Sequence, residues 1–354
     1  MQEEVEDRIL DTLILGGGQA GTSVAYFLKR TDLDYLILDD KREAGGSWLH
    51  TWDSLRLFSP SKYSSLSGWQ MPASAEEYPS KEDFLNYLRK YQKRYNFPVL
   101  RDTIVSEVYK KDDVFHIHTS KGIFRSKSVI SATGTAQSPF IPNYKNDFLY
   151  RGIQIHSVDY VNSEKLRNKR VLVVGGGNSG AQILAEVSKV ANTKWVTLNP
   201  PVFLPEHIDG RYLFLKANDL YLGEKTSPED KDISLSNIVQ VQSVREGLQR
   251  EVFEDFRPFK EFYENGVIWE DGSKEEFDAV IWCTGFKANL KHLKTLDIIS
   301  NNKILTDHTR SIRSPGLWLV GYGNWTGYAS ATIYGVGKTA KRTVEEIKEY
   351  LNNT

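Results

Sequence analysis

The stretch that decides the fold lies at residues 13–21 and reads Leu13-Ile14-Leu15-Gly16-Gly17-Gly18-Gln19-Ala20-Gly21. A short apolar run precedes three glycines, and apolar residues recur at helical spacing after them, so the pattern predicts a strand, a tight turn and a helix. In such a turn Gly16 permits the sharp bend, Gly18 lets the backbone approach a phosphate, and Gly21 lets the helix pack against the strand. Because a helix N-terminus presents free N–H groups, the stretch predicts a site for the pyrophosphate of a dinucleotide.

The same pattern returns about 160 residues further along the chain. The apolar run 171–174 is followed by Gly175-Gly176-Gly177-Asn178-Ser179-Gly180, and a second helix and strand are expected after it. Each copy is later matched by a strand that ends in Thr-Gly, at Thr133-Gly134 and at Thr284-Gly285. Two glycine turns, each between a strand and a helix, predict an α/β protein with two Rossmann-like dinucleotide-binding domains.

The residues downstream of the two turns distinguish the two sites. Asp39 lies 23 residues after Gly16, at the expected end of a strand, where a carboxylate accepts hydrogen bonds from a ribose and repels a 2′-phosphate. By the same count, the matching place in the second copy falls on Asn199, 24 residues after Gly175. The second site is therefore expected to tolerate a 2′-phosphate without requiring one. Arg211 is a hypothetical partner of that phosphate, the alternative being an ordinary solvated surface arginine.

Composition excludes several classes of function. The net charge is −1 and no long run of one sign occurs, which argues against a nucleic-acid or anionic-membrane surface. Cys283 is the only cysteine, which excludes a disulfide within the chain, a cysteine-based zinc site and the two-cysteine chemistry of a flavin disulfide reductase. Residues 1–7 lack the apolar core of an export signal, and no apolar run is long enough to span a membrane. We therefore expect a cytoplasmic protein without a metal site.

Three further stretches resemble a known family. Before the second turn, the chain reads Tyr150-Arg151-Gly152-Ile153-Gln154-Ile155-His156-Ser157-Val158-Asp159-Tyr160. This is similar to the Phe-x-Gly-x-x-x-His-x-x-x-aromatic pattern of the flavin-containing monooxygenases, with a tyrosine in place of the phenylalanine. Gly45-Gly46-Ser47-Trp48 and Trp282-Cys283-Thr284-Gly285-Phe286 also resemble the family. The resemblance covers nearly the whole chain and is greatest to the small bacterial single-chain members.

The resemblance implies how the domains and the cofactor contacts are distributed. An FAD domain is expected from residues 1–160 and 287–354, with an NAD(P)H domain, residues 161–286, inserted between its two parts. FAD contacts are expected from Gly16, Gly18, Gln19, Ala20, Gly21, Asp39, Gly46, Ser47, Trp48, Val105, Thr133, Gly134, Asn324 and Thr332. Contacts with NADPH or NADH are expected from Gly175, Gly177, Asn178, Ser179, Gly180, Asn199, Arg211, Thr284 and Gly285.

The resemblance also implies an activity. Flavin reduced by the nicotinamide would trap O2 as a C4a-hydroperoxyflavin and oxygenate a thioether or amine, with Baeyer–Villiger oxidation of ketones as a side activity. His156 is singled out by the family pattern, with shaping of the chain between the domains as its alternative role. Phe58 stands where family members often carry an asparagine beside the flavin, which makes a peroxide-releasing NAD(P)H oxidase the main alternative. A non-enzymatic flavin redox sensor is a further alternative. The expected partners are a small-molecule substrate and O2, and a homodimer is a plausible assembly.

Overall fold

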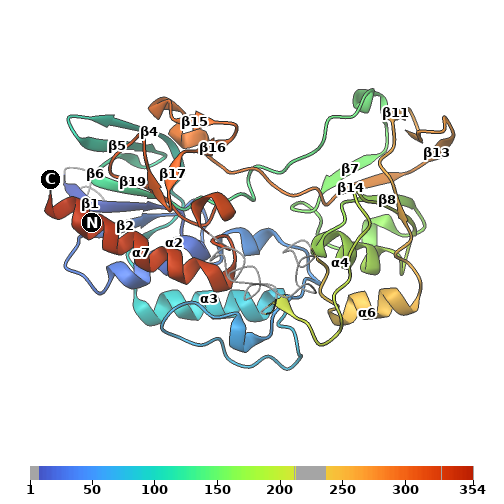
Figure 1. Ribbon diagram of the computed structural model, residues 1–354, viewed down its shortest axis with the longest axis horizontal. Helices are drawn as coiled ribbons and strands as arrows, with labels where there is room; N and C mark the ends of the chain where they lie inside the picture. The colour runs from blue at the N-terminus through green and yellow to red at the C-terminus, as the bar shows by residue number, and fades with distance from the viewer. Residues whose placement is uncertain (1–7, 211, 213–236, 328, 354) are drawn as a thin grey trace, which may run out of the picture.

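Two parallel sheets, each built around one of the glycine turns, organise the chain (Figure 1). The structure is a computed structural model that describes residues 8–210, 212, 237–327 and 329–353. The two sheets form separate lobes joined by two chain segments (Figure 1). The α/β class and the two Rossmann-like units predicted from the sequence are confirmed.

Among the described residues, the first sheet has nine strands, seven of them in the order β17-β18-β19-β6-β1-β2-β3, with β5 pairing with β6 and β4 with β5. Neighbouring strands from β19 to β3 run parallel. The strands are β1 (Ile9–Leu15), β2 (Tyr35–Leu38), β3 (Val99–Leu100), β4 (Val105–Lys111), β5 (Val114–Thr119), β6 (Gly122–Ser131), β17 (Thr306–Asp307), β18 (Arg310–Ser311) and β19 (Leu317–Leu319). Helices α2 (Gln19–Leu28) and α7 (Ile333–Asn352) lie side by side on one face of this sheet (Figure 1).

The second sheet has five parallel strands in the order β10-β9-β8-β14-β7 among the described residues. These are β7 (Ile153–His156), β8 (Arg170–Val174), β9 (Asn192–Val196), β10 (Asp255–Phe256) and β14 (Ala279–Trp282). Helices α4 (Asn178–Val187) and α6 (Gln242–Gln249) belong to this lobe (Figure 1). A small antiparallel sheet adds β11 (Glu261–Tyr263), β12 (Gly266–Ile268) and β13 (Lys274–Glu276), and β15 (Ile299–Ser300) pairs with β16 (Lys303–Ile304).

The chain passes to the second sheet earlier than the sequence suggested. A boundary was expected at residue 160, but β7 (Ile153–His156) already pairs with β14, with Ile153 opposite Ala279. The first crossing therefore precedes Ile153, because parallel pairing with β14 fixes the 153–156 stretch in the second sheet.

Local signals in the sequence account for several elements. Apolar and polar residues alternate around Lys121-Gly122, and this stretch forms the β5–β6 hairpin. Helix α7 begins at Ile333, and Thr332 caps it by accepting a hydrogen bond from the N–H of Gly335. Helix α3 (Lys81–Tyr95) begins with a capping box in which Ser80 and Asp83 bond each other's backbone N–H groups.

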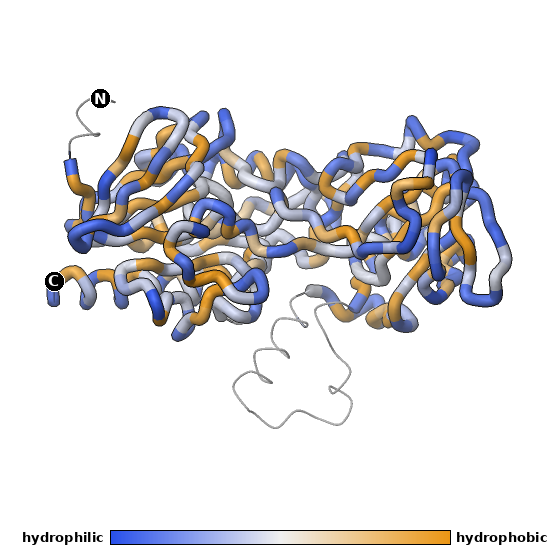
Figure 2. The backbone as a smooth tube through the Cα atoms, turned by 90° about the horizontal axis from the view of Figure 1, so that it is seen from above, coloured by the Kyte–Doolittle hydropathy of each residue, from blue (hydrophilic) through white to orange (hydrophobic). Residues whose placement is uncertain are grey.

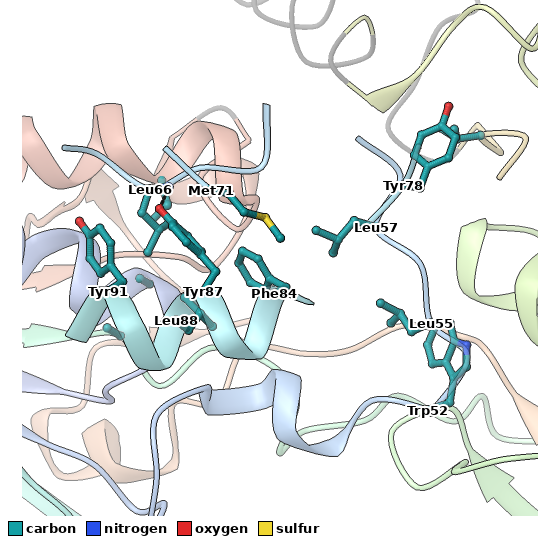
Figure 3. Packing of buried hydrophobic residues seen from close by; sticks show 14 of the residues in the cluster. Trp52, Leu55, Leu57, Leu66, Met71, Tyr78, Phe84, Tyr87, Leu88 and Tyr91 are labelled. Carbon is teal, nitrogen blue, oxygen red and sulfur yellow. Dashed lines mark hydrogen bonds between the residues drawn. The ribbon is translucent and has the colours of Figure 1, made fainter. Parts of the chain in front are cut away.

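Helix α3 anchors the segment that follows the first glycine turn. Figure 3 shows Phe84, Tyr87 and Tyr91 projecting from one side of α3 toward Leu66 and Met71 of that segment, and all of these side chains are buried. The hydroxyl of Tyr87 also accepts a hydrogen bond from the N–H of Leu66 at 2.8 Å. Because aromatic side chains bury much apolar area, this packing fixes the 66–71 segment against α3.

Each of the two lobes has a hydrophobic interior. Figure 2 shows hydrophobic stretches running through the interior of both lobes, with hydrophilic segments at many outer turns. Trp195, Trp282 and Trp318 are each at most 1% exposed and lie in the cores of the sheets. In the part of the chain that the structure describes, no helix is both long and apolar enough to cross a lipid bilayer.

Candidate active site

The first glycine turn forms a bare cradle at the start of α2. Gly16 adopts a positive φ of 105° and donates its N–H to the carbonyl of Leu38 at 2.8 Å, which ties the turn to the end of β2. A Cβ on Gly16 would lie 2.5 Å from the carbonyl oxygen of Ala132, and one on Gly21 would overlap the carbonyl oxygen of Gly16. A Cβ on Gly18, by contrast, would have only the Cα of Gly46 nearby, at 3.6 Å. The turn therefore needs glycine for packing at two positions and leaves the third open to a ligand.

Asp39 lies at the end of β2, with a side chain that is 3% exposed and ion-paired with Arg101. Burial raises the pKa of the Asp39 carboxyl, while Arg101 and the N–H of Gly17 act in the opposite direction. Arg101 follows β3 directly and also bonds the side chain of Gln92, whose amide donates to the carbonyl of Gly17 at 3.0 Å. The carboxylate expected to bind a ribose is thus held in place by a cation that sequence reasoning missed.

A cavity of about 820 Å³ extends from this turn. Eleven of the fourteen residues expected to contact FAD line it: Gly16, Gly18, Gln19, Ala20, Asp39, Gly46, Ser47, Trp48, Val105, Thr133 and Gly134. Gly21 lies beneath the turn, Thr332 lines an adjoining hollow, and Asn324 is exposed on η7 (Asn324–Thr326). Bare backbone at a helix start, with a carboxylate beside it in the wall of a large cavity, fits the pyrophosphate and ribose of FAD.

A buried polar chain borders the same cavity and was not predicted. His292 places its Nε2 2.9 Å from the hydroxyl of Ser131, which lies 2.5 Å from the hydroxyl of Tyr322. The Tyr322 hydroxyl is 2.7 Å from that of Thr133, and Thr133 donates to the carbonyl of Asn289. Burial lowers the pKa of His292 to about 4, so its imidazole is neutral at neutral pH. This series of hydrogen-bonded side chains fixes Thr133 at the wall of the cavity.

The adjoining hollow has a volume of about 170 Å³ and shares Gln19, Trp48 and Ala331 with the large cavity. Its other lining residues are Leu57, Phe58, Ser59, Tyr63, Ser64, Thr332, Ile333 and Tyr334. Among these described residues there is no carboxylate, lysine, arginine or histidine. The hollow therefore suits an uncharged molecule, and Phe58 lies in its wall.

Gln19 connects the glycine turn to the start of the last helix. Its side-chain oxygen accepts a hydrogen bond from the indole N–H of Trp48 at 2.9 Å, and its amide nitrogen donates to the carbonyl of Ala331 at 2.8 Å. Trp48 packs edge-on against Phe84 of α3, with ring centroids 4.6 Å apart. These contacts hold the N-terminus of α7, which carries a partial positive charge, at the edge of the hollow.

The second glycine turn repeats the geometry of the first. Gly175 has a φ of 129° and donates to the carbonyl of Val196 at 2.8 Å, as Gly16 does to Leu38. A Cβ on Gly180 would overlap the carbonyl oxygen of Gly175, whereas one on Gly177 would meet no atom within 4 Å. Gly177 therefore presents bare backbone to open space, as a phosphate site requires. Gly180 is needed for the packing of α4 against the turn.

Asn178 and Ser179, both expected to contact the nicotinamide cofactor, begin α4. The Asn178 side chain donates to the carbonyl of Asn237 at 2.8 Å and accepts from the N–H of Val239 at 2.9 Å. These bonds attach the 237–239 segment to the start of α4, so the side chain of Asn178 is already used within the protein. The backbone N–H groups of the first turn of α4 remain the feature suited to a phosphate.

The strand register shows that the residue of the second unit equivalent to Asp39 differs from the one expected from the sequence. Because Gly16 bonds Leu38 and Gly175 bonds Val196, the residue after Val196 corresponds to Asp39, and that residue is Thr197. The Cβ and Cγ2 of Thr197 would lie 3.2 Å from a Cβ on Gly176, just as Asp39 would crowd one on Gly17. The count along the sequence pointed to Asn199, which is exposed and lies two residues further on. Arg211, the hypothetical phosphate partner, lies outside the described residues.

Comparison with known proteins shows which family this chain resembles. The family described as "Pyridine nucleotide-disulphide oxidoreductase" matches residues 13–202, which is more than half of the chain. "Uncharacterized oxidoreductase CzcO" of Bacillus subtilis (strain 168) is 33% identical over 95% of this chain and 99% of its own length. The solved structure "Flavin-containing monooxygenase from Stenotrophomonas maltophilia" is 40% identical, with a TM-score of 0.89 over 97% of this chain and 99% of that chain. "Indole-3-pyruvate monooxygenase YUCCA4" of Oryza sativa subsp. japonica is 25% identical over 98% of this chain and 90% of its own length.

The chain belongs to the flavin-containing monooxygenases. It is an NAD(P)H-dependent flavin enzyme, and the resemblance inferred from its sequence is confirmed. FAD and a nicotinamide dinucleotide are its cofactors. Although the family description includes disulphide oxidoreductases, the single cysteine of this flavin monooxygenase cannot form the dithiol that such chemistry requires.

His156 of this flavin monooxygenase has a structural role in the crossing between the lobes. Its Nδ1 accepts a hydrogen bond from the N–H of Val158 at 3.2 Å, so Nε2 carries the proton and donates to the carbonyl of Gly285 at 3.0 Å. Burial lowers the pKa of His156, and the bond to Gly285 opposes that shift. Both ring nitrogens are thus engaged by backbone groups, and the side chain joins the ends of β7 and β14.

Thr284 and Gly285 follow β14 at the same edge of the sheet as the second turn. The hydroxyl of Thr284 donates to the carbonyl of Phe140, and the N–H of Phe140 donates to the carbonyl of Gly285 at 2.9 Å. A Cβ on Gly285 would meet no atom within 4 Å, so its backbone also faces open space. Parallel strands bring their carboxyl ends together, which places this stretch beside the second glycine turn.

Proposed function

We propose that this flavin monooxygenase transfers one oxygen atom of O2 to a soft nucleophile, the sulfur of a thioether or the nitrogen of a neutral amine, in a small uncharged molecule. The overall reaction consumes substrate, O2, NAD(P)H and a proton, and yields the oxygenated substrate, NAD(P)+ and water. FAD, when bound, supplies the acceptance of hydride and the activation of O2. Baeyer–Villiger oxidation of a ketone is proposed as a side activity.

The observation that carries this proposal is the hollow beside the flavin cavity. Among the described residues, its wall is made of Trp48, Phe58, Tyr63 and similar uncharged groups, with no carboxylate, imidazole or amine to act as a general base in hydrolysis or proton abstraction. A lone pair on sulfur or nitrogen needs no such activation. The protein's task is then to hold the substrate, to exclude water and to present the start of α7, which the Gln19 and Trp48 contacts position.

A second candidate function is the release of hydrogen peroxide by an NAD(P)H oxidase. Phe58 favours this alternative, because it places a hydrocarbon ring in the wall of the hollow where family members often have an amide. A ring cannot donate a hydrogen bond, so oxygen transfer would depend on the exclusion of water alone. A non-enzymatic flavin redox sensor would instead show slow reduction by either nicotinamide and no product.

One experiment separates these functions. The FAD-loaded enzyme is reduced anaerobically with NADPH and with NADH, then mixed with air and an aryl methyl thioether, and both sulfoxide and hydrogen peroxide are quantified against NAD(P)H consumed. Sulfoxide as the major product supports the proposal. Peroxide alone, at the full rate of NAD(P)H consumption, would establish the oxidase, and slow reduction without either product would establish the sensor.

A further inference from the structure

Each Rossmann unit has a third strand, and the two third strands pair with their neighbours in the same register. In the first unit β3 pairs with β2, with Leu100 opposite Leu38, and the N–H of Asp39 donates to the carbonyl of Leu100 at 3.0 Å. In the second unit, β10 and β9 pair in the same way. There Phe256 is opposite Val196, and the N–H of Thr197 donates to the carbonyl of Phe256 at 2.9 Å. The residues that directly follow β3 and β10 therefore occupy equivalent positions at the carboxyl edges of the two sheets.

Both equivalent positions are arginines. Arg101 follows β3 and reaches back across the sheet edge to the Asp39 carboxylate. Arg257 follows β10 and extends in the same way across the sheet edge, where its Nη1 donates a hydrogen bond to the carbonyl of Thr197 at 3.0 Å. In the first unit the arginine meets an acid at the ribose position. In the second unit the corresponding side chain is a neutral threonine, so the cation stands over the ribose position without an acid from that strand.

The negative partner of Arg257 comes from its own strand. Asp255 lies two residues earlier, on the same side of β10, and forms an ion pair with Arg257 while its Oδ2 accepts a hydrogen bond from the Thr197 hydroxyl at 3.0 Å. Asp255 therefore holds the guanidinium against the end of β9 and orients Thr197 as well. The guanidinium is ordered before any ligand arrives, which lowers the entropic cost of binding one.

We propose that Arg257 binds the 2′-phosphate of NADPH and is the residue through which this enzyme recognises that group. The inference depends on the proposed use of the second glycine turn for the nicotinamide dinucleotide. The Arg257 side chain is 46% exposed, and the bonds made to described residues engage two of its five N–H groups. Planar arginine groups bind phosphate through paired N–H donors, so the remaining edge suits a phosphate oxygen pair.

The test measures nucleotide binding and does not require turnover. Adenosine 2′,5′-bisphosphate and 5′-AMP are titrated by calorimetry into the FAD-loaded wild type and into Arg257→Gln, Arg257→Lys and Arg170→Gln. We expect Arg257→Gln to weaken the bisphosphate about tenfold, as the loss of one charge-assisted bond implies, and to change 5′-AMP affinity by less than about twofold. Arg257→Lys keeps the charge but loses the planar fork, so its affinity for the bisphosphate should lie between that of the wild type and that of Arg257→Gln.

Arg170 is a matched control because it belongs to the same sheet at the opposite edge. Its guanidinium is 45% exposed and pairs with Glu276 and Asp278, so its loss removes a similar surface ion pair. Arg170→Gln should leave both affinities unchanged. Equal weakening of both nucleotides by Arg257→Gln, or no change in either, would overturn the proposal. If the enzyme proved unable to oxygenate substrates, these binding results would stand unaffected.

Discussion

The guanidinium of Arg101 and the carboxylate of Asp39 form an ion pair at the end of β2, where the first glycine turn meets the large cavity. The pair arises from residues 62 positions apart, because β3 lies beside β2 and ends one residue before Arg101. The almost complete burial of Asp39 makes this cation important. A buried carboxylate without a partner is costly, and pairing with arginine offsets part of that cost and holds the side chain in place.

Arg101→Met should therefore lower the free energy of unfolding of the apoprotein at pH 7 by about 3 kcal/mol and should weaken FAD retention. Without the arginine, the pKa of Asp39 in the folded state rises further above its unfolded value, so the stability deficit is largest at high pH and shrinks as falling pH protonates the carboxyl. Urea unfolding at several pH values, with fluorescence titration of FAD, measures both effects. The double variant Arg101→Met/Asp39→Asn should recover most of the lost stability, and its failure to do so would contradict this explanation.

The glycines of the second turn should separate into packing and ligand positions. Gly180→Ala places a Cβ against the carbonyl of Gly175, so we expect a loss of about 3 kcal/mol in the free energy of unfolding. Gly177→Ala meets open space and should stay within about 1 kcal/mol of wild type, because its only structural cost is a poorer helix cap. Its KM for NAD(P)H should nevertheless rise about tenfold. A normal KM in folded Gly177→Ala would show that no phosphate approaches this turn.

His292 gives the stability of the fold a defined pH dependence. Its pKa is lowered to about 4 in the folded protein, against about 6.5 when unfolded. As pH falls from 6.5 toward 4, the unfolded chain binds a proton that the folded chain refuses, so the free energy of unfolding decreases by up to about 3 kcal/mol. His292→Gln keeps a polar group beside Ser131 but does not titrate, and should lose less stability over this interval. Identical slopes for the two proteins in urea unfolding would refute the assignment.

Trp48 should influence what fraction of the NAD(P)H consumed leads to oxygenated substrate and what fraction leads to peroxide. Trp48→Phe keeps a ring against Phe84 but removes the indole N–H that holds Gln19, so the start of α7 loses one of its supports. We expect the ratio of sulfoxide to peroxide to fall severalfold as water enters the hollow. Trp69→Phe is the control, since Trp69 contacts Tyr87 in the same aromatic region but does not line either cavity. A comparable fall in both variants would indicate general loosening of the α3 region.

The sequence was informative where the chemistry imposes a local pattern. The two glycine turns and Asp39 follow the patterns expected for phosphate and ribose binding, and the structure places the turns and the end of the strand before Asp39 where the sequence predicts them. The equivalent of Asp39 was misplaced because Thr197 lies 22 residues after Gly175, one fewer than the 23 that separate Asp39 from Gly16, and only the backbone bond to Val196 reveals this.

Other site residues had no local signal to find them by. Arg101 and His292 come from segments far from the glycine turns, and they reach the cavity only because strand pairing and loop packing bring them there. Arg257 was missed for the same reason, since its equivalence to Arg101 depends on the pairing of two-residue strands too short to show any periodicity. The first crossing between lobes was misplaced because the family pattern spans β7 without indicating its partner.

The one thiol of this enzyme also determines how its lobes can be studied. Cys283 is a partly exposed residue where β14 leaves the second sheet, its carbonyl against Gly175, and desolvation raises the pKa of its thiol to about 12. A thiol with a raised pKa reacts more slowly with maleimides at neutral pH than an ordinary surface cysteine, because the thiolate is the nucleophile. Surface cysteines introduced one on each lobe could therefore carry a fluorophore pair without first removing the native residue, and energy transfer between them would follow the separation of the lobes through a catalytic cycle.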